Sequence, residues 1–214
     1  RLGTSVAGAG DINGDGFDDI LVSATNGDFA NQIDVGVTYV IYGSSGSFPD
    51  SLRPRQLPTL SNRIPWGTRF LGEKASDVTG RMVGTFGDFD GDGHHDVLVS
   101  APSGGLEDRP YGGLVYLNFL PEPVRSNHFN LARSDLVIAS SRNLDKIGAH
   151  VNFAGDVNGD GFDDIVIQSP RARNAQNETV GAAYIVSGNP HGEIDHMDLQ
   201  DLDGTNGFTL LGSP

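Results

Sequence analysis

The sequence predicts an all-β fold built from three repeated four-stranded units, an arrangement typical of β-propeller blades. A nine-residue loop recurs three times in the 214-residue chain. Each copy leads into a short run of β-branched and apolar residues, which favours strands. The 30 glycines and 11 prolines indicate many turns. No stretch has the 3.6-residue apolar period of a helix, so the repeat indicates tandem β units.

The three copies align without gaps over the loop. They read GAGDINGDGFDDILVSA at 8–24, GTFGDFDGDGHHDVLVSA at 84–101 and FAGDVNGDGFDDIVIQS at 153–169. Each unit is expected to have one strand before the loop, one directly after it, a glycine-led third strand and a short fourth strand. The expected strands are 5–10, 20–22, 36–43 and 68–72; then 82–87, 97–99, 113–119 and 136–140; then 150–155, 165–167, 181–188 and 207–212.

These strands place the three blades at 1–79, 80–147 and 148–214. The second and third strands of each unit are nearly continuous apolar runs, as expected for strands covered on both faces. The alternative is a sandwich of hairpins, which would not need so strict a repeat.

The loop has the composition of a calcium site. Oxygen side chains stand at positions 1, 3, 5 and 9, and Ca²⁺ takes about six to eight oxygen ligands. Glycine at position 6 permits the turn that brings the position 7 carbonyl back toward the ion. The predicted ligands, with Phe17, His94 and Phe162 acting through their carbonyls, are Asp11, Asn13, Asp15, Phe17 and Asp19; Asp88, Asp90, Asp92, His94 and Asp96; and Asp156, Asn158, Asp160, Phe162 and Asp164.

Electrostatics also favours three Ca²⁺ ions. Carboxylates held about 4 Å apart repel by roughly 4 kcal/mol per pair at an effective dielectric of 20, so a cation is needed to hold them together. The second loop has four carboxylate ligands and is expected to bind most tightly. Position 12 is Val22, Val99 or Ile167, where an EF-hand needs Glu. A merely polar turn is the remaining alternative, and three copies in register argue against it.

The net charge of the chain excludes some classes of binding partner. There are 28 acidic and 14 basic residues, a net charge of −14, which disfavours nucleic acid and direct binding to an anionic membrane. No apolar run approaches the roughly 20 residues of a membrane span. The chain has no cysteine, which excludes disulfides and thiol catalysis.

No catalytic constellation stands out, and we expect no enzyme activity. The six histidines form no HExxH pair. The neighbouring acids Asp18 and Asp19 could suggest glycosidase carboxylates, but Asp19 is already a predicted metal ligand. Trp66, beside Arg63, is expected to pack between blades, the alternative being an exposed binding residue.

At these positions the sequence resembles the FG-GAP repeats of integrin α-subunit propellers and their bacterial relatives. The D-x-[DN]-x-D-G-x-x-D loop matches in all three units. The GAP element is similar to Ser100-Ala101-Pro102 and Gln168-Ser169-Pro170, and is degraded to Ser23-Ala24-Thr25 in the first unit. Of the FG element only the glycine remains, at Gly3, Gly80 and Gly148.

The resemblance implies a calcium loop between the first two strands of each blade, with a mainly structural metal. It implies a ring of seven blades, with ligands bound on loops elsewhere, usually on the opposite face. A similar propeller occurs in glycosylphosphatidylinositol-specific phospholipase D, behind a catalytic domain that nothing here resembles.

Three blades cannot close a ring. We therefore expect a piece of a longer protein, completed by further blades in cis or by another copy in trans. The expected function is calcium-stabilised, non-catalytic adhesion or binding of a protein or glycan ligand. Because weak calcium sites fill only where calcium is plentiful, the expected location is extracellular or the cell surface. The alternatives are an accessory propeller of a secreted hydrolase, such as a phospholipase, and a lectin.

Overall fold

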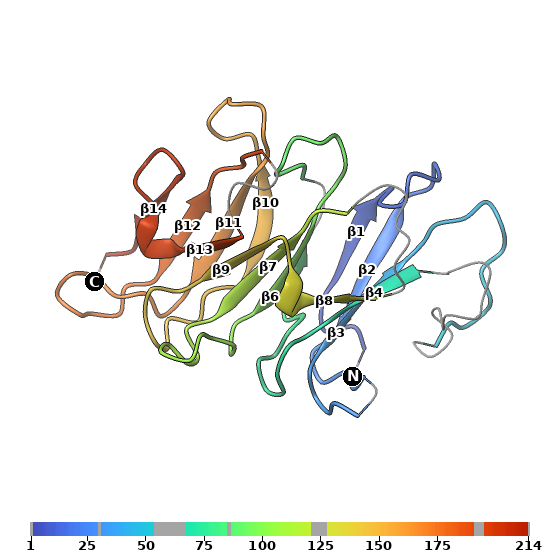
Figure 1. Ribbon diagram of the computed structural model, residues 1–214, viewed down its shortest axis with the longest axis horizontal. Helices are drawn as coiled ribbons and strands as arrows, with labels where there is room; N and C mark the ends of the chain where they lie inside the picture. The colour runs from blue at the N-terminus through green and yellow to red at the C-terminus, as the bar shows by residue number, and fades with distance from the viewer. Residues whose placement is uncertain are drawn as a thin grey trace.

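The chain folds into three twisted sheets that lie side by side (Figure 1). The computed structural model describes residues 2–29, 31–53, 67–84, 87–120, 128–190 and 195–213. Over these ranges the helices are two single 3₁₀ turns, η2 (Leu131–Arg133) and η3 (Leu199–Asp201), so the all-β prediction is confirmed. Neither turn is long or apolar enough to cross a membrane. Arg63 and Trp66 lie outside the described residues, so the prediction for Trp66 stays untested.

Each sheet has the four strands that the repeat predicts, in chain order. The first sheet holds β1 (Val6–Gly10), β2 (Asp19–Ala24), β3 (Val37–Ile41) and β4 (Gly67–Leu71). The second holds β5 (Val83–Gly84), β6 (Val97–Ala101), β7 (Leu114–Asn118) and β9 (Leu136–Ala139). The third holds β10 (Val151–Gly155), β11 (Asp164–Ser169), β12 (Ala182–Val186) and β14 (Gly207–Leu211).

The four expected strands of each sheet pair antiparallel. Two short additional strands were not predicted, and they give two of the three sheets a fifth strand. β8 (Phe129–Asn130) pairs parallel to β4, and β13 (His196–Asp198) pairs parallel to β9. Each comes from the connection before the last strand of one sheet and adds a fifth strand to the sheet before it. They use the backbone groups of an otherwise open edge, and they are too short to show a period-two pattern.

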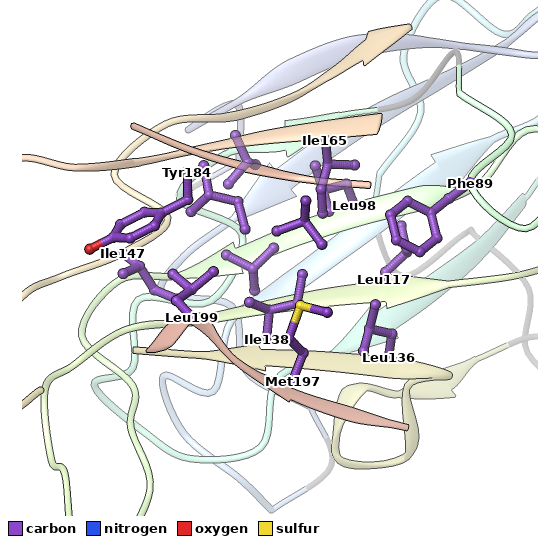
Figure 2. Close-up of a cluster of buried hydrophobic side chains, with 14 of the residues drawn as sticks. Phe89, Leu98, Leu117, Leu136, Ile138, Ile147, Ile165, Tyr184, Met197 and Leu199 are labelled. Atoms are coloured by element: carbon purple, nitrogen blue, oxygen red, sulfur yellow. The ribbon is translucent and has the colours of Figure 1, made fainter. Parts of the chain in front are cut away.

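The core lies between the sheets and follows the period-two alternation of their strands. On β6, Val97 and Val99 pack toward the first sheet, whereas Leu98 packs toward the third. Figure 2 shows the cluster between the second and third sheets, where Leu98 lies beside Ile165 and Ile138 lies beside Met197. All of β6 and β7 is buried, as predicted for strands covered on both faces. In the first sheet Ile20 of β2 stays 48% exposed.

Candidate metal centre

The three predicted calcium loops connect the first and second strands of their sheets and lie along one edge of the molecule, the upper edge in Figure 1. A β-bulge precedes the first and third loops, between Gly8 and Gly10 and between Phe153 and Gly155. The glycine at position 6 has φ of 90° in the first and second loops and 98° in the third. Because side chains strain this left-handed conformation, glycine is needed there.

Carboxylates hold each loop in the same turn. In the first loop the Gly16 amide donates to Asp11 Oδ2 at 2.7 Å, and the Phe17 amide donates to Asp15 Oδ1 at 3.0 Å. The corresponding distances are 2.8 and 2.8 Å in the second loop, and 3.0 and 3.0 Å in the third. The aspartates at positions 1 and 5 therefore set the backbone of the loop.

The aspartate at position 9 is the buried anchor of every loop. Asp19, Asp96 and Asp164 are each 1% exposed. Each accepts the backbone N–H of the residue at position 2, at 3.1, 2.7 and 2.9 Å respectively. A buried carboxylate needs such donors or a cation, because burial without a partner is costly.

Only in the second loop do three carboxylates converge, over the residues that the structure describes. One oxygen from each of Asp88, Asp90 and Asp96 lies within 4.8 Å of the others. Asp88 Oδ1 is buried and has no hydrogen-bond partner in the described chain. An orphaned, buried carboxylate oxygen beside two buried carboxylates fits a hard cation such as Ca²⁺. This cluster could therefore hold a metal ion.

The electrostatics of the anchors agrees with that assignment. The pKa of Asp96 is raised to about 9, mainly by burial; the Phe89 amide lowers it, and the nearby Asp90, Asp88 and Asp92 contribute smaller increases. In the first loop burial raises the pKa of Asp19 to about 6, with smaller contributions from Asp15 and Asp11. A bound cation would favour the ionised carboxylates and reverse both shifts.

The first and third loops are closed differently because position 3 is asparagine. The Asn13 amide donates to Asp15 Oδ2 at 3.1 Å, and the Asn158 amide donates to Asp160 Oδ2 at 2.7 Å. The Asp90 carboxylate, at position 3 of the second loop, has no N–H group that it could donate. In the second loop Asp92 lies outside the converging group. The first- and third-loop ligand sets, Asp92, and the carbonyls of Phe17, His94 and Phe162 stay predictions.

Position 8 of the loop has a role that was not predicted from the sequence. The Asp88 amide donates to Asp163 Oδ2 at 3.0 Å, and the Asp163 amide donates to the Asp88 carbonyl at 2.9 Å. The third loop is thereby tied to the first residue of the second loop. At the same junction a side chain on Gly91 would overlap the Phe162 ring. The sequence does contain a signal for this contact, because aspartate stands at position 8 in two of the three loops.

The second loop meets the first in a similar way. His95, also at position 8, lies where a side chain on Gly10 would be. Positions 7 and 8 of one loop thus face the loop of the preceding sheet. In the first loop, Phe17 is 40% exposed and Asp18 is exposed as well.

Known proteins are similar in sequence to this chain, including the segments that contain the three loops. The family model FG-GAP repeat matches residues 2–41, 82–117 and 151–186, together more than half of the chain. Phosphatidylinositol-glycan-specific phospholipase D of Bos taurus is 30% identical over 99% of this chain and 24% of its own length. Integrin alpha-PS3 of Drosophila melanogaster is 30% identical over 78% of this chain and 15% of its own length. Integrin alpha-PS5 of the same fly is 32% identical over 77% and 14%.

This chain spans about a quarter of the length of the phospholipase relatives it matches. Each of the three matched segments contains one of the loops described above, with a strand on either side. The chain belongs to the FG-GAP repeat family.

Proposed function

We propose that this chain is a calcium-binding, non-catalytic propeller segment of a secreted or cell-surface protein, used in adhesion or protein–protein binding. The main support is the second loop, where Asp88, Asp90 and Asp96 converge and Asp88 Oδ1 has no hydrogen-bond partner among described residues. The equivalent loops on the neighbouring sheets would hold one Ca²⁺ each. In this role the metal locks the turn between two strands.

Calcium removal tests the metal part of the proposal. At a free Ca²⁺ concentration of about 100 times Kd, one site adds about 2.7 kcal/mol to the free energy of unfolding. For a domain of this size the melting temperature should rise by roughly 5–10 °C relative to EDTA. Titration calorimetry should count three sites in the wild type and two in Asp90→Ala. The control Asp18→Ala should keep three, and an EDTA-insensitive melting curve would refute the assignment.

The proposed location follows from the expected affinity. Extracellular calcium modules bind at about 10⁻⁴–10⁻³ M, which matches calcium outside cells and not in the cytosol. Micromolar Kd at all three sites would remove this argument.

A second candidate is an accessory propeller of a hydrolase. It is favoured by the alignment with phosphatidylinositol-glycan-specific phospholipase D of Bos taurus along 99% of this chain. Both candidates predict no hydrolysis by the chain itself. Release of a glycosylphosphatidylinositol-anchored reporter by the purified chain would contradict the non-catalytic role.

A further inference from the structure

A depression of about 430 Å³ lies at the strand ends opposite the metal loops, between the second and third sheets. Arg81 stands before β5, and Lys146 and His150 stand before β10; all three line it. Ser103 and Gln168 contribute polar groups to the same wall. Four segments far apart in sequence therefore meet around one hollow.

The charge of this hollow is opposite to that of the chain. The protein carries 28 acidic against 14 basic residues, yet the lining contains two permanent cations, a histidine and no carboxylate. Arg81, Lys146 and His150 make no side-chain ion pair within the described ranges. Arg81 and His150 are exposed, and Lys146 is half-buried. Cations left unpaired in a strongly acidic protein create a local positive potential that attracts an anion.

The walls of the depression are held in place by the backbone. The Gln168 amide donates to the His150 carbonyl at 2.9 Å, and the Arg81 amide donates to the Val78 carbonyl at 3.1 Å. Val78 and Lys146 lie at equivalent positions of the repeat, two residues before Gly80 and Gly148, and have φ of 59° and 57°. Left-handed backbone is strained for a β-branched residue such as valine, and strain of this kind is concentrated at functional sites. A rigid wall lowers the entropic cost of binding a ligand.

A second depression of about 370 Å³ adjoins the first and shares His150 and Gln168 with it. It runs over β1, β5 and β10, the first strands of the three sheets, and most of its lining is apolar, including Met82, Val83 and Val151. The combined groove therefore offers a cationic end beside an apolar end. Such a surface matches a peptide in which an acidic side chain is next to an apolar one.

We propose that this groove binds a carboxylate-bearing peptide segment of a partner protein. The carboxylate lies between Arg81 and Lys146, and the neighbouring apolar side chain lies in the adjoining depression. This deepens the proposed binding role, because it assigns the partner's chemistry and a site on the side away from the metal loops. It does not depend on calcium binding by any one loop.

The test is an amide NMR titration of the calcium-saturated chain with N-acetyl-Asp-Leu-amide. We expect shifts at the Gln168 and His150 amides, with affinity reduced at least about tenfold for N-acetyl-Asn-Leu-amide. The double variant R81S/K146S should lose the shifts. The matched control R133S/K74S, which removes two cations outside the groove, should keep them.

Lys146→Gly provides a second variant, since glycine accepts φ of 57° and the fold should be retained. It should weaken the Asp-Leu probe as well. Equal binding of both dipeptides, or shifts confined to other residues, would overturn the proposal. Preferential binding of sulfate or a heparin oligosaccharide in the groove would overturn the peptide assignment in favour of an anionic glycan. Because calcium stoichiometry is measured separately, failure here leaves the metal proposal standing.

Discussion

The second loop and its two neighbours share one sequence design, but their surroundings differ. At position 2, Ile12 and Phe89 are 2% and 1% exposed, whereas Val157 of the third loop is 53% exposed. Positions 7 and 8 are half-buried in the second and third loops and exposed in the first. Position 2 thus contacts the following sheet, and positions 7 and 8 contact the preceding one. Only the second loop is enclosed on both sides, and only there do three carboxylates converge within the described chain.

The ability of a loop to hold a metal ion therefore depends on the neighbouring sheets as well as on the ligand residues of the loop. The turn itself is local, since the same hydrogen bonds close all three loops. The convergence of carboxylates is not local, because it requires buried ligands held close together. Four experiments can test whether the second loop differs from its neighbours in this way.

The largest effect is expected from removing the covered side chain at position 2. Phe89→Ala should lower the free energy of unfolding by about 3–5 kcal/mol, because it deletes a buried aromatic ring. The matched change Val157→Ala should cost less than about 0.5 kcal/mol, since that side chain is open to solvent. Urea unfolding in saturating calcium measures both. Equal costs would show that the third loop is as enclosed as the second.

The pH dependence of the calcium-free protein should be the next largest effect. The pKa of Asp96 is raised to about 9 and that of Asp19 to about 6. A raised pKa in the folded state means that folded protein binds more protons than unfolded protein, so stability is highest below pH 4 for these groups and is lost as pH rises.

In EDTA, the free energy of unfolding should therefore fall by about 4 kcal/mol between pH 5 and pH 8, mainly through Asp96. Asp96→Asn should flatten the upper part of this profile, and Asp19→Asn only the part below about pH 6. Calcium should also flatten it, because the cation favours the ionised carboxylates. A profile that rises with pH in EDTA would contradict the assignment.

A smaller effect is expected at position 8. Asp163→Ala removes a charged acceptor of the Asp88 amide and should cost about 1–2 kcal/mol. It should also weaken calcium binding at the second loop, because Asp88 loses its support from the third. The matched variant Asp18→Ala, at an exposed position, should change neither quantity. Calorimetry with calcium and urea unfolding would separate the two effects, and identical behaviour of both variants would refute the coupling.

The smallest effect is expected from Asn13→Asp, which gives the first loop the ligand types of the second. It removes the hydrogen bond from Asn13 to Asp15 and should lower calcium-free stability by less than about 1 kcal/mol. We expect a modest gain in calcium affinity, since one carboxylate is added without the enclosing contacts. Site-resolved NMR titration measures it. Affinity equal to that of the second loop would mean that ligand type alone sets the site.

The strand pattern could be predicted because the threefold repeat and the β-branched, apolar runs beside each loop are local features of the sequence. The runs after the loops became β2, β6 and β11, with the alternation that places Val97 and Leu98 on opposite faces. The parallel strands β8 and β13 could not, because two or three residues carry no period and their pairing depends on which edge lies nearby. The groove around Arg81 and Lys146 was likewise invisible, since it joins residues from separate units.

The repeat, the strands and the turn of each loop can be read from the amino-acid sequence, because they depend on contacts between residues close in the chain. Glycine at position 6 and the aspartates at positions 1, 5 and 9 specify the loop wherever it occurs. Which loop brings its carboxylates together depends instead on how the sheets pack in three dimensions. That depends on contacts such as the hydrogen bond between Asp88 and Asp163, which are 75 residues apart. Such contacts form only when one sheet packs on the next.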